Sequence, residues 1–267
     1  MLAAAAPAPA QSDFSSPYVP TPTVAVERML GLAQVTRDDL VMDLGSGDGR
    51  IVIAAAKRHG ARATGVEYDP KLVALSRQNA LAAGVGERVR FVEGDLFDVD
   101  LSPATVVTVY LLPDVNLKLR DKLLRELRPG ARVVAHDFDF ESWRPDRVES
   151  FYAPEKNRGR GGTSRVMLWI VPAEVRGTWV LRSAALPAPG EAQVVLSQNF
   201  QVLEGDAMLG ERRAALREPA LRGAVIRFSL DAVAGPLRFA GEVRGDEIAG
   251  TVRGAAGTWP WRATRRR

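Results

Sequence analysis

Two patterns of apolar residues alternate along residues 1–172. Short, nearly continuous apolar runs are typical of strands buried in a parallel sheet, and they fall at 40–44, 63–67, 88–92, 104–112 and 131–135. Between these runs, helical spacing of apolar residues predicts helices at 26–33, 50–59, 70–84 and 114–128. Residues 141–162 predict an irregular segment, and 165–171 a closing strand. Strands and helices that alternate in this way indicate an α/β fold.

Helix ends are marked by capping residues. Thr23 suits the N-cap of the first helix, because its hydroxyl can accept from a free backbone N–H. Gly60 suits a C-cap, where the chain turns left-handed. Asp69-Pro70 begins a further helix.

The pattern changes at Gly177, after which short stretches alternate apolar and polar residues. They predict strands at 178–182, 192–203, 223–231, 237–243, 247–253 and 258–264. Gly205-Asp206 and Gly245-Asp246 have the composition of two-residue hairpin turns, and Ala214 to Arg217 could form a short helix. Evenly spaced strands of this kind predict a small antiparallel all-β domain, barrel-like or sandwich-like. On its outer strands, Arg262 or Arg265 could cover Trp179.

The chain therefore divides into three parts, at 1–16, 17–172 and 173–267. The first part is rich in alanine and proline, and it is either a disordered end or the remnant of a signal peptide. We expect a cytoplasmic protein, or an exported one if this start is a trimmed leader. The all-β part lacks clustered acids or histidines, so we expect it to bind a partner, position a substrate or form an oligomer.

Charge and composition exclude several classes of protein. The formal net charge is only +4, and the surplus lies after residue 172, so a nucleic-acid partner is not expected. The chain has no cysteine, which excludes disulfides, thiolate metal sites and cysteine nucleophiles. No apolar run reaches the ~20 residues that a membrane-spanning helix needs.

The most informative stretch is a glycine-rich turn at 43–50, between the first strand and the next helix. Glycines allow the backbone N–H groups to approach a ligand closely, and the ligand meets the start of a helix. The spacing is G-x-G-x-G, whereas the dinucleotide fingerprint is G-x-G-x-x-G. Asp43, just before the first glycine, would repel a pyrophosphate but would suit a ligand that carries an ammonium and a sulfonium.

This turn resembles motif I of the class I S-adenosylmethionine (SAM) methyltransferases, and the resemblance extends over residues 17–172. PYVPTP at 17–22, DLGSGDGRIVIAAAK at 43–57 and YLLP at 110–113 look like small prokaryotic-type protein-lysine methyltransferases. That group includes relatives of the mitochondrial ATP-synthase c-subunit lysine methyltransferase. The resemblance implies a Rossmann-like domain with a seven-stranded sheet and SAM as the cofactor.

The resemblance also implies how the cofactor is held. The methionine part would lie against the residues of the glycine turn, namely Asp43, Gly45, Ser46 and Gly47. Glu67 ends the second strand, where an acid suits two hydrogen bonds from ribose hydroxyls. Asp95 would take the adenine amino group, with the backbone N–H of Leu96 facing the ring. Tyr18 and Thr21 either form a lid over the cofactor or only lead into the first helix.

The acceptor side departs from the family pattern. Many amine methyltransferases have an Asn- or Asp-Pro-Pro-aromatic motif here, but this chain has Tyr110 in place of the amide or acid and keeps only Pro113. Tyr110 could orient the nucleophile or be a core residue. Asp137 could neutralise or deprotonate an amine. Asp137 and Asp139 could also bind a metal, but no third ligand is evident, so no metal is expected.

Three functions remain open. A protein lysine amine is the acceptor that the resemblance favours. A small-molecule oxygen or nitrogen is the alternative if Phe138, Phe140, Trp143 and Phe151 line an apolar pocket. The third hypothesis is a non-catalytic SAM-sensing protein whose all-β part binds an apolar ligand.

Overall fold

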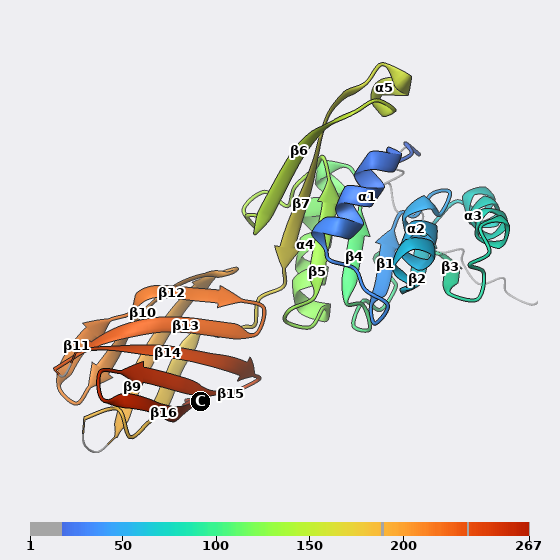
Figure 1. Ribbon diagram of the computed structural model, residues 1–267. Helices are drawn as coiled ribbons and strands as arrows, with labels where there is room; N and C mark the ends of the chain where they lie inside the picture. Colours follow the sequence, from blue (N-terminus) through green and yellow to red (C-terminus); the bar gives the residue numbers. More distant parts are fainter. Residues whose placement is uncertain (1–17, 188–189, 234, 267) are drawn as a thin grey trace, which may run out of the picture.

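The computed structural model describes residues 18–187, 190–233 and 235–266 (Figure 1). Within these residues the chain forms a seven-stranded mixed sheet flanked by helices, followed by a nine-stranded antiparallel sheet. The predicted fold class is therefore confirmed. The expectation for residues 1–16 lies outside the described residues.

The first sheet is parallel over its first five strands in spatial order. Its elements are α1 (Thr23–Leu32), β1 (Leu40–Leu44), α2 (Arg50–His59), β2 (Arg62–Glu67), α3 (Pro70–Ala82), β3 (Val89–Glu93), β4 (Val106–Val109), α4 (Pro113–Glu126), β5 (Arg132–His136), β6 (Arg147–Ala153), α5 (Lys156–Gly159) and β7 (Gly162–Ile170). The strand order is β3-β2-β1-β4-β5-β7-β6, and β7 runs antiparallel to β5. The order reverses between β1 and β4, which is where ligands bind in open α/β sheets.

The sheet is covered on both faces, as its continuous apolar strands require. One buried cluster joins one face to α1, α2 and α3, through side chains such as Met29, Val52 and Val73. A second cluster joins the other face to α4, through Leu119 and Leu123. Two of the predicted caps are confirmed: Asp69 accepts from the backbone N–H of Lys71, and Gly60 is left-handed.

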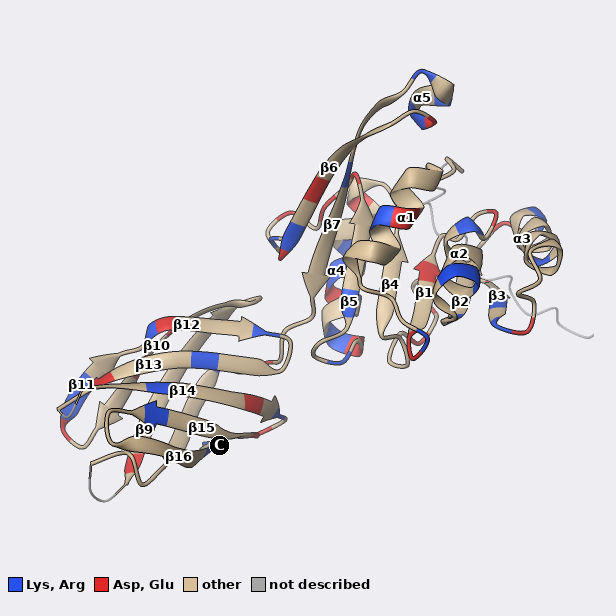
Figure 2. Cartoon of the chain, in the orientation of Figure 1, with Lys and Arg blue, Asp and Glu red and all other residues tan. Residues whose placement is uncertain are grey.

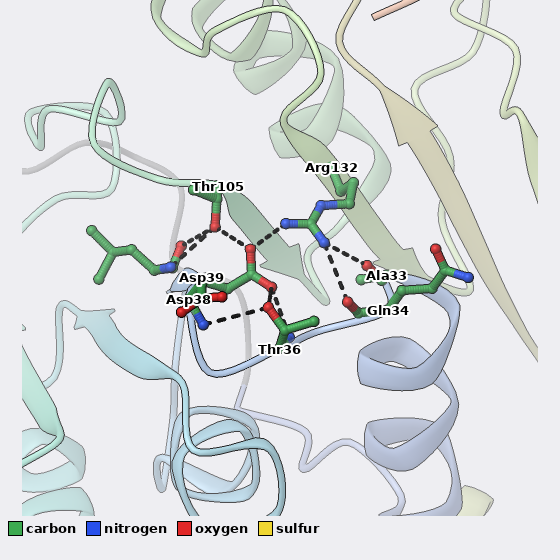
Figure 3. A network of polar contacts seen from close by, with 8 residues as sticks. Ala33, Gln34, Thr36, Asp38, Asp39, Thr105 and Arg132 are labelled. Carbon is green, nitrogen blue, oxygen red and sulfur yellow. Dashed lines mark hydrogen bonds and ion pairs between the residues drawn. The ribbon is translucent and has the colours of Figure 1, made fainter.

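A buried polar network fastens the amino ends of β1 and β5 (Figure 3). The carboxylate of Asp39 accepts hydrogen bonds from Thr36, Thr105 and Arg132. Arg132 also donates to the backbone carbonyl of Ala33, at the end of α1, at 2.9 Å. The network lies at the edge of the sheet opposite the carboxyl ends of the strands, so it stabilises the fold away from the ligand side.

The second domain is a nearly closed barrel. Its strands are β8 (Gly177–Arg182), β9 (Glu191–Asn199), β10 (Val202–Leu209), β11 (Arg212–Ala215), β12 (Arg217–Arg222), β13 (Val225–Ala232), β14 (Gly235–Arg244), β15 (Glu247–Gly254) and β16 (Gly257–Arg265). Phe228, Phe239 and Trp261 pack together inside it. The guanidinium of Arg265 lies 4.5 Å from the ring centroid of Trp179, one of the two arrangements the sequence predicted. Figure 2 shows Lys and Arg positions along several strands of the barrel, among them β13, β14 and β15.

Several local predictions are wrong. Gly205 lies within β10 and not in a turn; the chain reverses at Phe200 instead. The strand needs glycine at this position because a Cβ there would lie 2.4 Å from the carbonyl oxygen of Val195. No helix forms at 214–217, because residues 214 and 215 end β11 and residue 217 begins β12. The segment 141–162 is not irregular, because it contains β6 and α5. Thr23 is the first helical residue, and Pro22 occupies the N-cap.

The two domains meet at the turn between β9 and β10. Phe200 adopts a left-handed φ of 54° and stacks on Trp143 with ring centroids 6.1 Å apart. The guanidinium of Arg120 lies 5.6 Å from the same ring, and Gln201 donates to the backbone carbonyl of Arg144 at 2.7 Å. An aromatic side chain of the barrel thus packs against the core of the first domain.

Strands β6 and β7 form a long hairpin that carries α5 at its tip, beside α1 (Figure 1). The carboxylate of Glu155, just before α5, accepts from the backbone N–H and the hydroxyl of Thr23. These contacts satisfy a free backbone donor at the start of α1, because the N-cap residue Pro22 has no side chain that could accept a hydrogen bond. The tip of the hairpin therefore supports the helix that follows residues 18–22.

Candidate active site

A cavity of about 300 Å³ lies beyond the carboxyl ends of β1, β2 and β4, where the strand order reverses. Every residue predicted to bind the cofactor lines it. These residues, together with the predicted acceptor-side tyrosine, are Tyr18, Thr21, Asp43, Gly45, Ser46, Gly47, Glu67, Asp95, Leu96 and Tyr110. Pro113 is outside this lining and is the first residue of α4, where its missing N–H costs nothing.

The glycine turn is held in a shape that needs glycine. Gly45 and Gly47 have φ of 76° and 54°, in the left-handed region. A side chain on Gly47 would lie 2.6 Å from the ring of Tyr18. The backbone N–H of Gly47 donates to the carboxylate of Glu67 at 2.8 Å, so Glu67 orients the turn as well as facing the cavity.

Asp43 is a buried acid at the wall of the cavity, with 3% of its surface exposed. Burial raises the pKa of Asp43 to about 7; the hydrogen bond from Thr108 lowers it, and the nearby Glu67 and Asp48 raise it further. A cationic group in the cavity would stabilise the ionised form. The Ser46 hydroxyl, also buried there, has no hydrogen-bond partner among the described residues.

Tyr18 and Thr21 lie over the turn, and the sequence did not predict what fastens them. Arg50 donates to the backbone carbonyl of Thr21 at 2.8 Å and forms an ion pair with Asp48 at 2.7 Å. The pKa of Tyr18 is raised by burial and by the neighbouring Asp48. Asp48 and Arg50 stand inside the glycine-rich motif, but nothing in its spacing indicates that they reach the segment 18–21.

The predicted acceptor side begins at Tyr110, directly after β4. Its ring centroid lies 4.2 Å from that of His136, and burial, followed by the charge of Asp137, raises the pKa of Tyr110. His136 is fully buried, and its Nε2 lies 3.0 Å from the hydroxyl of Ser164. Burial lowers the pKa of His136 to about 4, so its imidazole is neutral near pH 7. This packed position agrees with the packing role considered for His136.

Asp137 contacts His136 but does not line the cavity. Its carboxylate is 3.5 Å from Nε2 of His136 and 2.7 Å from the ammonium of Lys156. Lys156 comes from α5, a segment that the sequence predicted to be irregular. Because this pair depends on the hairpin folding back, nothing local in the sequence indicated it.

Two of the four aromatic residues that could have lined an apolar pocket lie in the core instead. Phe140 and Trp143 are fully buried, and both pack against Trp169. Their rings fill the interior next to the barrel and so cannot receive a small-molecule acceptor. Within the described residues, no three His, Asp or Glu side chains come together as a metal site. None of the described helices has the length and apolar character to cross a membrane.

The geometry fits SAM on two counts. The cavity contains an unpartnered buried hydroxyl, Ser46, and a turn that excludes side chains, which leaves room and hydrogen-bonding capacity for a ligand. It also contains a buried acid that a cation would stabilise. Together with the reversed strand order, these features define a class I SAM-dependent methyltransferase.

Comparisons with known proteins agree with this class. A family model of the ANTKMT methyltransferase domain matches residues 43–147. A protein-lysine N-methyltransferase of Saccharolobus islandicus is 49% identical over 133 residues, which cover 49% of this chain and 83% of that protein. The human lysine N-methyltransferase of the ATP-synthase c-subunit is 43% identical over 140 residues, which cover 52% of this chain and 59% of that protein.

A solved structure of an RNA methyltransferase from Salinibacter ruber, in complex with S-adenosyl-L-homocysteine, is also similar. It is 52% identical, with a TM-score of 0.54, and the match covers 59% of this chain and 96% of that one. The chain belongs to the family of class I SAM-dependent methyltransferases represented by the Saccharolobus enzyme, and its cofactor is SAM.

Proposed function

We propose that this chain transfers the methyl group of SAM to the side-chain amine of a lysine in a protein. The observation that carries the proposal is the carboxylate of Asp137 at the carboxyl end of β5. It lies beside His136, whose ring packs on the cavity-lining Tyr110. An acid at this place suits an acceptor that arrives as an ammonium. The similarity to the Saccharolobus protein-lysine N-methyltransferase supports the same acceptor.

SAM supplies a methyl group bonded to a positively charged sulfur, so its carbon is already activated. The residues of this chain then mainly bring the acceptor into line, and alignment alone can lower a barrier by ~7–11 kcal/mol. Asp43, the glycine turn, Glu67, Asp95 and Leu96 would hold the cofactor. The methyl transfer itself needs few acid–base groups. This agrees with a cavity lined mainly by the glycine turn and by apolar and aromatic residues such as Tyr110.

The acceptor must lose its proton before its nitrogen can attack. Tyr110 and the buried His136 are themselves neutral near pH 7, and desolvation beside them favours the neutral form of an amine. The nitrogen lone pair then forms the new N–C bond as the C–S bond breaks, and the proton is released to solvent. Tyr110 would orient the amine at the mouth of the cavity.

An RNA acceptor is the second candidate, because the similar Salinibacter protein is named an RNA methyltransferase. Acidic residues such as Asp48, Asp69 and Asp95 outnumber the one basic residue, Arg50, in the lining of the cavity, and this balance disfavours phosphates. A protein acceptor therefore fits the electrostatics of the site better.

The test is incubation of the purified protein with methyl-tritiated SAM and a cell lysate. We expect label in protein that survives ribonuclease and is recovered as methylated lysine after hydrolysis. Label that ribonuclease releases would replace lysine by RNA, and label in a solvent extract would indicate a small molecule. Binding of SAM with no S-adenosylhomocysteine formed would favour a sensor.

A further inference from the structure

Lys156 contacts Asp137, the acid that the proposed function assigns to the acceptor. Its ammonium lies 2.7 Å from the carboxylate of Asp137 and also donates to the backbone carbonyl of Thr163. Asp137 in turn lies beside His136, whose ring packs on the cavity-lining Tyr110. The ammonium of Lys156 is thus the same chemical group, on the same side chain, that a protein acceptor would bring to this wall.

The backbone at Asp137 is clamped in place. Asp137 has a left-handed φ of 61°, which is uncommon for a residue other than glycine. Its N–H donates to the carbonyl of Arg165 at 2.8 Å, and one carboxylate oxygen accepts from the N–H of Arg165 at 3.0 Å. The guanidinium of Arg165 also donates to the carbonyl of Asp137. These bonds leave the second carboxylate oxygen directed at Lys156.

Lys156 is somewhat more exposed than the carboxylate it contacts. It lies at the tip of a hairpin, in α5, where the next two residues, Asn157 and Arg158, have left-handed backbones. Its side chain is 21% exposed, and that of Asp137 is 14% exposed. Solvent therefore reaches the pair, and a second ammonium can approach the same carboxylate.

We propose that the carboxylate of Asp137 and the carbonyl of Thr163 form a site beside the cavity that first receives the acceptor's ammonium group, before the amine moves to Tyr110, and that Lys156 fills this site until an acceptor displaces it. The ligand class is a primary alkylammonium. The assignment rests on the proposed lysine acceptor, and it adds the residues that receive the acceptor and the side chain that competes with it.

The probe is n-butylammonium, which reproduces the end of a lysine side chain. Its affinity for the S-adenosylhomocysteine-loaded protein is measured by calorimetry for wild type and for K156M. We expect K156M to bind the probe at least tenfold more tightly, because the internal competitor is gone. K156R keeps a cation at this place and should bind as weakly as wild type.

Two further variants separate the site from general effects on stability. Adding D137N to K156M should abolish the gain. K122M removes a comparable ion pair, the one between Lys122 and Glu126 on α4, and should leave probe binding at the wild-type value. Thermal melts report whether each variant is folded.

The outcomes distinguish this inference from the proposed function. If wild type methylates protein lysine but K156M binds n-butylammonium no more tightly, the site is wrongly assigned and the function stands. If probe affinity rises in K156M and falls again with D137N, yet label never reaches lysine, the ammonium site stands and the proposed function fails. A lowered KM for a lysine-rich peptide in K156M, which K122M should not show, is the kinetic counterpart.

Discussion

The hydroxyl of Thr108, on β4, donates a 2.7 Å hydrogen bond to the carboxylate of Asp43, on β1. The two residues are register partners in adjacent parallel strands, so the sheet itself fixes the contact. One oxygen of Asp43 is thereby oriented inside the sheet while the residue still lines the cavity.

Asp43→Asn should weaken SAM binding by at least tenfold and stabilise the cofactor-free protein at pH 8. The pKa of Asp43 is about 7 in the folded protein, above its ordinary value of 3.8. The folded state therefore holds a proton that the unfolded state releases, and stability falls as pH rises from about 4 to about 7. The variant should flatten this slope, a change on the order of 2–4 kcal/mol in the free energy of unfolding at pH 8.

Denaturation at pH 5 and pH 8 checks the stability change, and calorimetry with SAM checks the binding. Thr108→Val is the partner variant. Loss of its hydrogen bond should raise the pKa of Asp43 further and move the slope to higher pH. An Asp43→Asn protein that binds SAM as wild type does would contradict the assignment.

His136→Gln should act in the opposite pH window. The pKa of His136 is about 4 in the folded protein, against 6.5 ordinarily, because burial disfavours the imidazolium. The unfolded chain takes up a proton first, so this residue reduces stability as pH falls from about 6.5 to about 4. The glutamine variant should unfold less steeply with acid over that range. An unchanged acid slope would show that His136 does not stay neutral.

Glu67→Gln should lower SAM affinity about 10- to 100-fold, the effect of weakening one or two hydrogen bonds to a charged group. Glu67 accepts from the N–H groups of Gly47, Tyr68 and Asp69, so Glu67→Ala should also loosen the turn and destabilise the protein by about 1–3 kcal/mol. Glu93 is the register partner of Glu67 on β3 and is exposed. Glu93→Gln is therefore the matched control, and an equal loss of affinity there would refute the role of Glu67.

Asp39→Asn should destabilise the fold by about 2–3 kcal/mol and leave SAM affinity unchanged. Burial alone would raise the pKa of Asp39, but the hydrogen bonds from Thr105, Thr36 and Arg132 outweigh it and lower the pKa. Removing one partner leaves the other charge uncompensated, which costs about 3–5 kcal/mol when fully buried and less here, since Arg132 is partly exposed. Asp38→Asn, at the exposed neighbouring position, should change neither quantity; urea denaturation measures both variants.

Phe200→Ala should destabilise the chain by about 1–3 kcal/mol, because the stacking on Trp143 is lost. Phe200→Gly loses the same ring but relieves the left-handed backbone, so it should be more stable than the alanine variant by about 1 kcal/mol. Val202 is 55% exposed on the same hairpin, and Val202→Ala is the control. Equal midpoints of denaturation for the alanine and glycine variants would show that the turn is not strained.

Local sequence signals predicted those parts of the fold that local interactions determine. The run of β-branched residues around Val107 and the caps at Gly60 and Asp69 were interpreted correctly, because burial on both faces and turn geometry leave direct traces in the sequence. Gly205 was misread as a turn residue, since a glycine needed for close strand approach looks the same as one needed for a left-handed turn. Strand β6 was missed because its residues are mostly exposed and show little apolar alternation.

The same distinction holds for the site. The cofactor side follows from the spacing of Asp43, the glycines and Glu67, which the turn brings together. The contacts of Lys156 with Asp137 and of Glu155 with Thr23 join segments that are far apart in sequence. They depend on how the β6–β7 hairpin bends, and no motif encodes that bend.

Glu155 and Lys156 are consecutive residues, yet they contact two different parts of the first domain. Glu155 accepts hydrogen bonds from Thr23, which follows the cavity-lining residues 18–21. Lys156 forms an ion pair with Asp137, at the end of β5. Two adjacent residues of one short turn cannot be repositioned independently. A shift of this turn would therefore move the contacts of Thr23 and of Asp137 together.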